Sequence, residues 1–232
     1  MKLSIMQPYL FPYLGYWQMI TFADKFVLFD DVNYIVRGWI TRNNILLNGR
    51  PFLFTLPIEG ASPNKQILQL KLQDNGKVRS KLLRSMECAY RKAPMFDDVF
   101  PVISGILNND ERDLVKFLRF QFLEIYRYLG IADNTLLSSE IPQNPELKAQ
   151  DKIMGICKYL GADHYINAIG GQQLYDREYF RSENVKLSFI KMKDVRYRQF
   201  NDDFVPNLSI IDVLMFNTVE ETRKLLSEFE LI

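Results

Sequence analysis

The sequence predicts an α/β fold of Rossmann-like type, in which an open, mostly parallel sheet carries a β-hairpin addition and a helical section. Short apolar runs typical of buried strands alternate with segments of helical periodicity, as strands and crossover helices do in parallel sheets. An Asn-Gly turn joins two further strand-like runs within the hairpin addition, residues 38–57. Amphipathic helical patterns then fill residues 77–130. We expect one domain over residues 1–232.

The first strand is expected at residues 3–6, where an apolar run ends at Gln7-Pro8 because proline cannot donate to a sheet ladder. A rigid loop follows, with two prolines and several aromatic residues. Helical periodicity covers residues 14–23, and a second apolar run at 26–29 ends in Asp30-Asp31. Ligands of open α/β sheets bind beyond the carboxyl ends of the strands, so this opening predicts a site at residues 7–16 and 30–31.

The middle of the chain predicts the hairpin and the helices. Asn48-Gly49 suits a two-residue turn because both residues tolerate positive φ. A short edge strand is expected at residues 67–72, and helices are expected at 78–90 and 96–107. The most regular helical pattern runs from an Asn109 cap to residue 129, and Gly130 ends it.

The last third alternates between strands and helices. Strands are expected at residues 135–138, 165–169 and 187–192. A helix is expected to open at residues 143–145 and end at Gly161, and another to begin after an Asp176 cap. Two terminal helices are expected at residues 209–216 and 219–229.

Composition excludes several classes of function. The net charge is +1, with 29 basic and 28 acidic residues, so no global field favours nucleic acid or an anionic membrane. No apolar run approaches the roughly 20 residues that span a bilayer, and we expect a cytoplasmic protein. Both cysteines, Cys88 and Cys157, fall in apolar helical patterns and are expected to be buried thiols. The one histidine, His164, excludes a multi-histidine metal site and lies at the start of a strand, away from the carboxyl edge of the sheet.

The opening loop supplies the first candidate site. Gln7 ends the first strand, and the loop is expected to form an amphipathic wall that contacts a ligand through Tyr9, Phe11, Tyr13 and Tyr16. The structural alternative is a stiff hydrophobic turn that only closes the sheet.

The second candidate combines Asp30 and Asp31 with Arg42 and Asn43. Carboxylates at a strand end can bind a hydroxyl, an amine or a metal, and arginine can hold a carboxylate or phosphate through two hydrogen bonds. The structural alternative is an acidic turn that forms an ion pair with Arg42.

Three further groups complete the candidate substrate-binding residues. Tyr90 and Lys92 lie in a cationic helix junction, where cations also suit a helix C-terminus without any ligand. Asn167, Gly170 and Gly171 follow a strand, where backbone amides can approach an anion. The last group is Tyr197, Gln199, Ser209 and Asp212, in which Ser209 and Asp212 are also expected to form a helix-capping box.

Several motifs, taken together, resemble the WbqC-like family of bacteria. They are M-Q-P-Y-x-F-P-Y-x-G-Y at residues 6–16, A-D-x-F-V-x-x-D-D-V at 23–32, T-R-N at 41–43, A-Y-x-K-A-P-x-F at 89–96, L-G-A-D-x-Y at 160–165 and F-x-P-x-L-S-I-I-D at 204–212. Two departures stand out: Asn217 is followed by Thr218 where the family tends to have glycine, and position 164 usually does not carry histidine. The resemblance implies a place in O-antigen or other surface-polysaccharide assembly, because the family's genes are associated with such clusters. A member of the family has been proposed to transfer glycine to a sugar.

The leading hypothesis is an enzyme that transfers an aminoacyl or acyl group to an amino sugar, supplied as a nucleotide-linked substrate. Asp30 or Asp31 would remove the proton of the amine, while Gln7, Arg42 and the Gly170-Gly171 amides would hold substrate. The partners expected are this small molecule and an acyl donor, without nucleic acid or membrane insertion. The sequence identifies no cofactor or metal and leaves homo-oligomerisation open.

Two alternatives use the same opening loop. The strand–loop–helix order is similar to that of Rossmann-like nucleotidyltransferases, but Tyr13 and Tyr16 stand where their two histidines would be. This alternative predicts a degenerate site that binds a nucleotide or nucleotide sugar. The third hypothesis is a non-enzymatic scaffold of a glycan pathway, with an exposed aromatic patch over residues 9–16.

Overall fold

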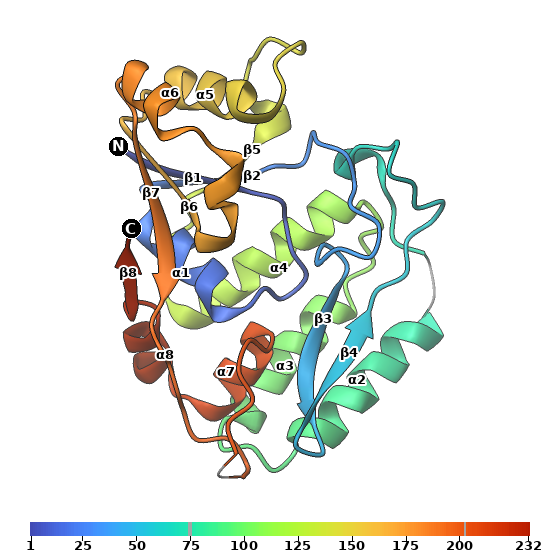
Figure 1. The fold of residues 1–232 in the computed structure, drawn as a ribbon. Coiled ribbons are helices and arrows are strands. Elements are labelled where there is room, and N and C mark those ends of the chain that lie inside the picture. The colour runs from blue at the N-terminus through green and yellow to red at the C-terminus, as the bar shows by residue number, and fades with distance from the viewer. Residues whose placement is uncertain (74–75, 202) are drawn as a thin grey trace.

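The structure, a computed structural model, describes residues 1–73, 76–201 and 203–232 (Figure 1). Within these residues the main sheet has six strands in the order β5-β2-β1-β6-β7-β8. Neighbouring strands are parallel except β7 and β8, which are antiparallel. The strands are β1 (Lys2–Met6), β2 (Lys25–Leu28), β5 (Thr135–Leu137), β6 (His164–Ala168), β7 (Lys186–Met192) and β8 (Phe229–Leu231). The predicted α/β class with a mostly parallel open sheet is confirmed.

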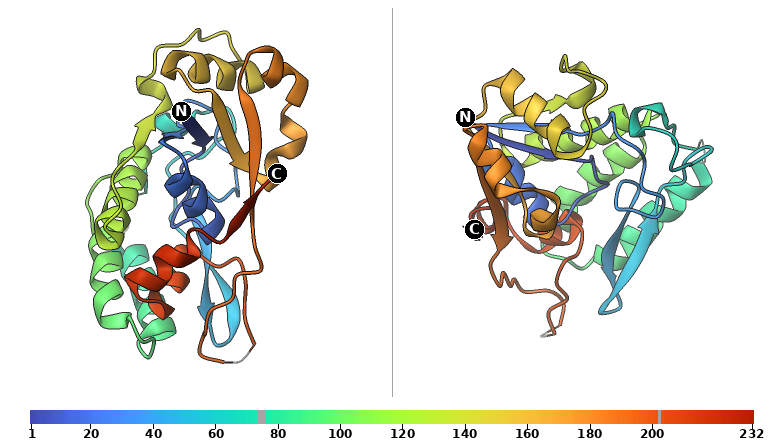
Figure 2. Two further views of the ribbon diagram at one scale, coloured as in Figure 1. Left: turned by 90° about the vertical axis from the view of Figure 1, so that its left-hand side faces the viewer. Right: turned by 45° about the horizontal axis from the view of Figure 1, so that its top comes forward.

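Helices cover both faces of this sheet (Figures 1 and 2). Alternate strand residues point to opposite faces, so Leu3 and Ile5 of β1 pack in one core and Phe26 and Leu28 of β2 in the other. The core of Leu3 and Ile5 includes α5 (Ala149–Leu160) and α6 (Arg177–Ser182). The core of Phe26 and Leu28 includes α1 (Leu14–Phe22) and α4 (Leu114–Leu129).

The hairpin addition forms a separate antiparallel pair, β3 (Arg42–Leu47) and β4 (Arg50–Thr55). Its turn residues have φ of 52° at Asn48 and 73° at Gly49, as the predicted Asn-Gly turn requires. The hairpin packs on α2 (Gly76–Tyr90), which begins the helical section together with α3 (Phe96–Leu107). Two C-terminal helices join this section, with α7 (Ile210–Phe216) against α3 and α8 (Val219–Leu225) against α4.

Several local predictions are corrected. The expected edge strand at 67–72 is a 3₁₀ turn, Ile67–Gln69, followed by isolated bridges at Lys71 and Leu72. The cap of α4 is Asp113, whose side chain accepts from the Lys116 amide, whereas the Asn109 side chain accepts from the Glu111 amide before the helix.

Differences also occur near the ends of elements in the last third of the chain. The helix expected to open at residues 143–145 begins at Ala149. The expected terminal helix at 219–229 ends at Leu225, and the chain then adds β8 to the sheet. Two of the three residues of β8 are exposed, so no buried apolar run marks this strand in the sequence.

The two cysteines differ in exposure. Cys157 is buried in α5, and burial raises the pKa of its thiol to about 12. Cys88 is exposed on α2, which corrects the expectation that both thiols are buried. Among the described helices, none is long and apolar enough to cross a membrane.

Candidate ligand-binding site

A cavity opens at the carboxyl edge of the sheet, where the order of the strands reverses. The chain proceeds from β1 to β2 and β5 on one side, and then returns to place β6 and β7 on the other side of β1. The cavity is lined by Tyr9 after β1, by Gly170 after β6 and by Met192 at the end of β7. Ligands of open α/β sheets bind at such a switch point, so this cavity is the candidate site.

The walls of the cavity are mainly apolar and aromatic, and its volume is about 480 Å³, which is within the usual range for small-molecule sites. Three aromatic residues, Tyr9, Tyr13 and Trp39, come from the opening loop and the segment before β3. The other lining residues are Pro12, Gly15, Asn43, Ile169, Gly170, Ile190, Lys191, Met192 and Asn207.

The polar groups of the cavity are few and available. Within the described chain, the hydroxyls of Tyr9 and Tyr13 and the side chains of Lys191 and Asn207 have no hydrogen-bond or ion-pair partner. Burial raises the pKa of both tyrosines, so at neutral pH they offer neutral hydroxyls. Among the described residues that line the cavity there is one cation, Lys191, and no carboxylate. The cavity therefore suits a ligand with a flat or ring-shaped face and several hydroxyls, and Lys191 offers one contact to a phosphate or another anionic group.

The opening loop is held rigidly in place. Phe11 has a left-handed φ of 43°, which a non-glycine residue adopts only when its surroundings enforce it. Its amide donates to Gln121 Oε1 at 2.8 Å, and its carbonyl accepts from Asn43 Nδ2 and Ser209 Oγ, each at 2.8 Å. These bonds come from α4, β3 and the cap of α7, so three distant segments fix the loop that carries Tyr9 and Tyr13.

Gly15 sets the orientation of Tyr13. A Cβ at position 15 would lie 2.6 Å from Cε2 of the Tyr13 ring, which is closer than carbon atoms approach. The ring can therefore lie against the first turn of α1 only because residue 15 has no side chain. This gives a physical reason for the glycine in the opening motif.

The structure divides the predicted aromatic wall into two parts. Tyr9 and Tyr13 are half-buried and line the cavity. Phe11 and Tyr16 are fully buried and cannot contact a ligand, since Phe11 packs near Phe54 and the Tyr16 hydroxyl donates to the Gln7 carbonyl. The loop thus contributes Phe11 and Tyr16 to the hydrophobic core and Tyr9 and Tyr13 to the cavity, and it does not form an exposed aromatic patch.

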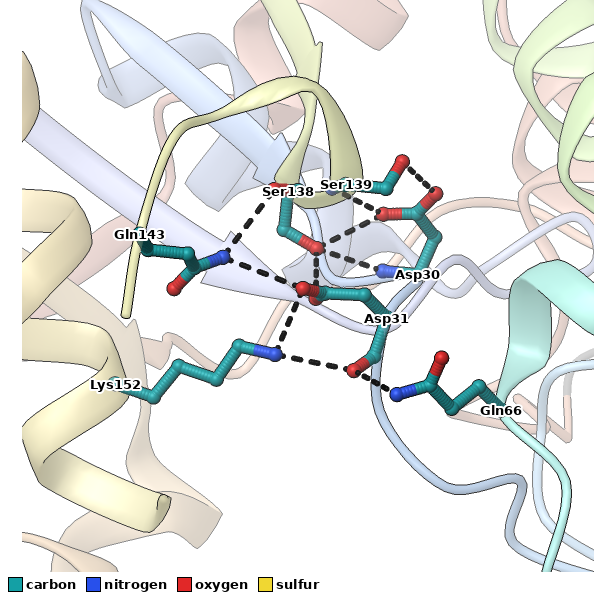
Figure 3. A network of polar contacts seen from close by, with 7 residues as sticks. All are labelled: Asp30, Asp31, Gln66, Ser138, Ser139, Gln143 and Lys152. Carbon is teal, nitrogen blue, oxygen red and sulfur yellow. Dashed lines mark hydrogen bonds and ion pairs between the residues drawn. The ribbon is translucent and has the colours of Figure 1, made fainter. Parts of the chain in front are cut away.

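Asp30 and Asp31 form a polar network with the chain after β5 (Figure 3). The Asp30 side chain is buried, with 1% of its surface exposed. Its carboxylate oxygen Oδ1 accepts from Ser138 Oγ at 2.8 Å and from the Ser139 amide. The other oxygen, Oδ2, accepts from Ser139 Oγ at 2.6 Å. The Asp30 amide donates in turn to Ser138 Oγ. Asp30 therefore joins β2 to β5 and has no free face for a substrate.

Asp31 is more accessible than Asp30. Its carboxylate lies within hydrogen-bond distance of Ser138 Oγ, whose single proton is shared between Asp30 and Asp31, and it accepts from Gln143. It also forms an ion pair with Lys152 of α5 at 2.8 Å, and the Asp31 side chain is 17% exposed. The ion-pair partner of Asp31 is therefore Lys152, and not Arg42 as the structural alternative predicted. Arg42 instead donates to the Gly38 carbonyl and lies over the Trp39 ring, 5.6 Å from its centre.

Asp212 is the centre of a buried cluster. Its carboxylate accepts from Tyr90 at 2.8 Å, from Tyr197 at 2.6 Å and from Gln199 at 2.7 Å. Burial raises the pKa of Asp212, although these three hydrogen bonds act in the opposite direction. The carboxylate thus ties the segment before α7, which leads to Asn207 in the cavity, to α2.

Ser209 caps α7 as predicted, with its Oγ accepting from the Ile211 amide. The expected capping box is not formed, because both Asp212 oxygens accept from the cluster instead. Four residues that were predicted to bind substrate instead form hydrogen bonds among themselves: Tyr90, Tyr197 and Gln199 donate to Asp212.

Of four further residues predicted to bind substrate, Asn43 and Gly170 line the cavity, and Asn167 and Gly171 do not. Asn43 lines the cavity, but its Nδ2 donates to the Leu10 and Phe11 carbonyls. Asn167 bonds Tyr165 and Tyr175, and Gly171 fits closely against its Oδ1, so only Gly170 of that group lines the cavity.

Gln7 and Lys92 lie outside the cavity lining. Gln7 is half-buried at the end of β1, and its side-chain amide has no partner among the described residues. Lys92 is exposed after α2, beside a second and smaller cavity.

Sequence reasoning missed Trp39, Lys191, Met192 and Asn207. Lys191 and Met192 could have been found, because they end a predicted strand at the same edge of the sheet as Gln7. Trp39 and Asn207 lie in irregular segments, where only the folded structure shows their approach. Among the described residues, no group of three or more His, Cys, Asp or Glu side chains could hold a metal ion.

Comparisons with known proteins give a family but no activity. A model described as "WbqC-like protein family" matches residues 7–224. A relative from Mycobacterium tuberculosis (strain ATCC 25618 / H37Rv), described as "Uncharacterized protein Rv1507c", is 25% identical over 222 residues, which cover 95% of each chain. No solved structure matches the chain significantly.

Proposed function

Since the chain belongs to the WbqC-like protein family, we propose that it is an enzyme of surface-polysaccharide biosynthesis that transfers an aminoacyl or acyl group to an amino sugar. The nucleotide-linked sugar binds in the switch-point cavity. The single observation that carries this proposal is the combination of aromatic walls with unpartnered polar groups in that cavity.

Each part of the cavity has a role in this proposal. The rings of Tyr13 and Trp39 pack against the faces of the sugar or the base, and the Tyr9 and Tyr13 hydroxyls bond the sugar hydroxyls. Lys191 contacts the phosphate, since it is the one cation among the lining residues. Orientation in a pre-formed cavity is a large contribution to catalysis in such group transfers.

The chemical step joins the amine nitrogen to the acyl carbon, while the leaving group departs from the donor. For the proton that leaves the amine, we propose Asp31 as the acceptor, in preference to Asp30. Asp31 follows β2, the strand next to β1, and its side chain is partly exposed, whereas both carboxylate oxygens of Asp30 are hydrogen-bonded to Ser138 and Ser139. Asp31 is not among the residues that line the cavity, so this role requires the reacting amine to extend beyond that lining toward the end of β2.

The two alternative functions have less support. Adenylyl transfer places a triphosphate in the site, and one lysine with no second cation among the lining residues is a poor match for that charge. A scaffold would present the opening aromatic residues to a partner, but Phe11 and Tyr16 are fully buried.

A binding panel tests the proposal. Trp39 lines the cavity and Trp17 is fully buried, and these are the two tryptophans of the chain. Titration with uridine and thymidine diphosphate amino sugars should change the Trp39 fluorescence, and the Trp39→Phe variant should remove that change. Nucleotide triphosphates that bind as tightly as the amino sugars would contradict the proposed substrate. Transfer is then measured by mass spectrometry of the sugar, with Asp31→Asn expected to reduce turnover without lowering sugar affinity.

A further inference from the structure

A concentration of positive charge lies on α2 and the turn that follows it. Residues 77–92 hold six basic side chains and one acidic side chain, whereas the whole chain has a net charge of only +1. Helix α2 lies at the outer edge of the helical section, beside the hairpin (Figure 1). This local excess calls for a partner of opposite charge.

The helix separates its charged and apolar faces. Lys77, Lys81 and Arg84 are exposed and follow one another at spacings of four and three residues, which places them on one stripe within about 60° of the helix circumference. Arg91 and Lys92 extend the exposed stripe past the C-terminal end of the helix. The buried face opposite contains Leu82, Met86 and Ala89.

Five of the six cations have no partner within the described chain. Lys77, Lys81, Arg84, Arg91 and Lys92 form neither an ion pair nor a side-chain hydrogen bond there. The sixth, Arg79, turns inward to the ring of Phe117 and the Leu107 carbonyl. Like charges at these helix spacings destabilise a helix, so the stripe is not explained by the stability of α2.

We propose that this stripe docks the protein on an anionic membrane surface without insertion. Clusters of four to eight basic residues on a helix are typical of binding to acidic lipid headgroups. A folded protein partner would require apolar anchors at the centre of the interface, and residues 76–92 expose no large hydrophobic side chain. Single-stranded nucleic acid would require a row of stacking rings. The one aromatic residue of this segment, Tyr90, is buried, and Phe200, beside Arg91 and Lys92, is a single exposed ring at one end of the stripe.

The geometry agrees with a planar layer of headgroups. From Lys77 to Lys92 the stripe extends about 22 Å at 1.5 Å per residue. Long lysine and arginine side chains adapt to charges that diffuse in a fluid layer, so binding depends on their number and not on a fixed arrangement. Each cation near such a surface contributes about fivefold in partitioning, the factor that corresponds to about 1 kcal/mol.

Co-sedimentation with vesicles tests this proposal. The full chain should sediment with phosphatidylglycerol–phosphatidylcholine vesicles, remain in solution with pure phosphatidylcholine, and be released at 0.5 M salt. The variant Lys77→Gln/Lys81→Gln/Arg84→Gln should partition about 100-fold more weakly. Its melting temperature should equal or slightly exceed that of the wild type, because these side chains are exposed and unpaired and their mutual repulsion is removed.

A matched control uses three exposed, unpaired lysines of other elements: Lys25→Gln/Lys148→Gln/Lys224→Gln, which should partition like the wild type. Equal loss in the control would show that net charge and not the stripe is responsible, and would overturn the proposal. Absence of wild-type binding to phosphatidylglycerol at low salt would also overturn it, as would retention on duplex DNA at salt that abolishes vesicle binding.

Discussion

The substitution Gly15→Ala tests the origin of the ligand wall directly. The added Cβ would lie 2.6 Å from Cε2 and 3.2 Å from Cζ of Tyr13. Ordinary contacts of this kind are 3.4–4 Å, so the Tyr13 ring must move by about 1 Å. A displacement of that size at a substrate-positioning group can reduce activity about 100-fold.

Stability should respond much less than binding. Alanine favours a helix over glycine by about 1 kcal/mol, which opposes the overpacking term of about 1–3 kcal/mol. We therefore expect a change of a few degrees at most in the melting temperature. The matched control is Gly105→Ala in α3, where no atom lies within 4 Å of the new Cβ and where ligand affinity should be unchanged.

Turnover, followed by mass spectrometry of the sugar, measures the loss of activity. Trp39 fluorescence with the amino-sugar nucleotide that binds best to the wild type measures the accompanying loss of affinity. An affinity that equals that of the wild type in the Gly15→Ala variant would refute the role assigned to the Tyr13 ring. An equal loss in Gly105→Ala would show that the effect is not local to the cavity.

Three further changes test the surrounding network. Asp30→Ala should lower the free energy of unfolding by about 3 kcal/mol, since its buried donors lose their acceptor, and Asp31→Ala should lower it less; denaturant titration measures both, and an equal loss would contradict the difference in burial. Asp212→Ala should release the segment before α7, so that trypsin cleaves after the exposed Arg198 faster than in the wild type. Burial and the nearby Lys186 lower the pKa of His164 below 6.5, so its contribution to stability is complete above pH 6.5 and is lost as the pH falls. His164→Gln should therefore have a smaller drop in melting temperature between pH 7.5 and 5.5, and an unchanged drop would remove this residue from the pH response.

The sequence predicted the sheet well because its strands carry strong local signals. The apolar runs ending at Gln7-Pro8 and Asp30-Asp31, and the Asn48-Gly49 turn, all report local backbone requirements. The α4 cap was misplaced because Asn109, Asp110 and Asp113 are each suitable caps, and only tertiary packing selects Asp113.

The fold brings only some of the predicted site residues to the switch-point cavity. Tyr9 and Tyr13 line it, whereas Tyr16, four residues after Pro12, is turned into the core by the helix. Periodicity could not separate them, because the left-handed φ of Phe11 changes the direction of the chain. That conformation depends on two hydrogen bonds of Phe11, whose amide donates to Gln121 and whose carbonyl accepts from Ser209, and both partners lie more than 100 residues away.

The polar residues show a similar limit. Asp212 and Asp30 were selected as site residues because carboxylates near strand or helix ends often bind ligands. Both are instead surrounded by donors of this chain, from Tyr90, Tyr197 and Gln199 in one case and from two serines in the other. Sequence spacing contains no information about such distant partners.

A crystal structure with a bound nucleotide-linked amino sugar tests the central proposal most directly. We expect ligand density in the switch-point cavity, with the sugar against the Tyr13 ring and a phosphate in contact with Lys191. Density for the sugar elsewhere, with this cavity filled only by solvent, would contradict it.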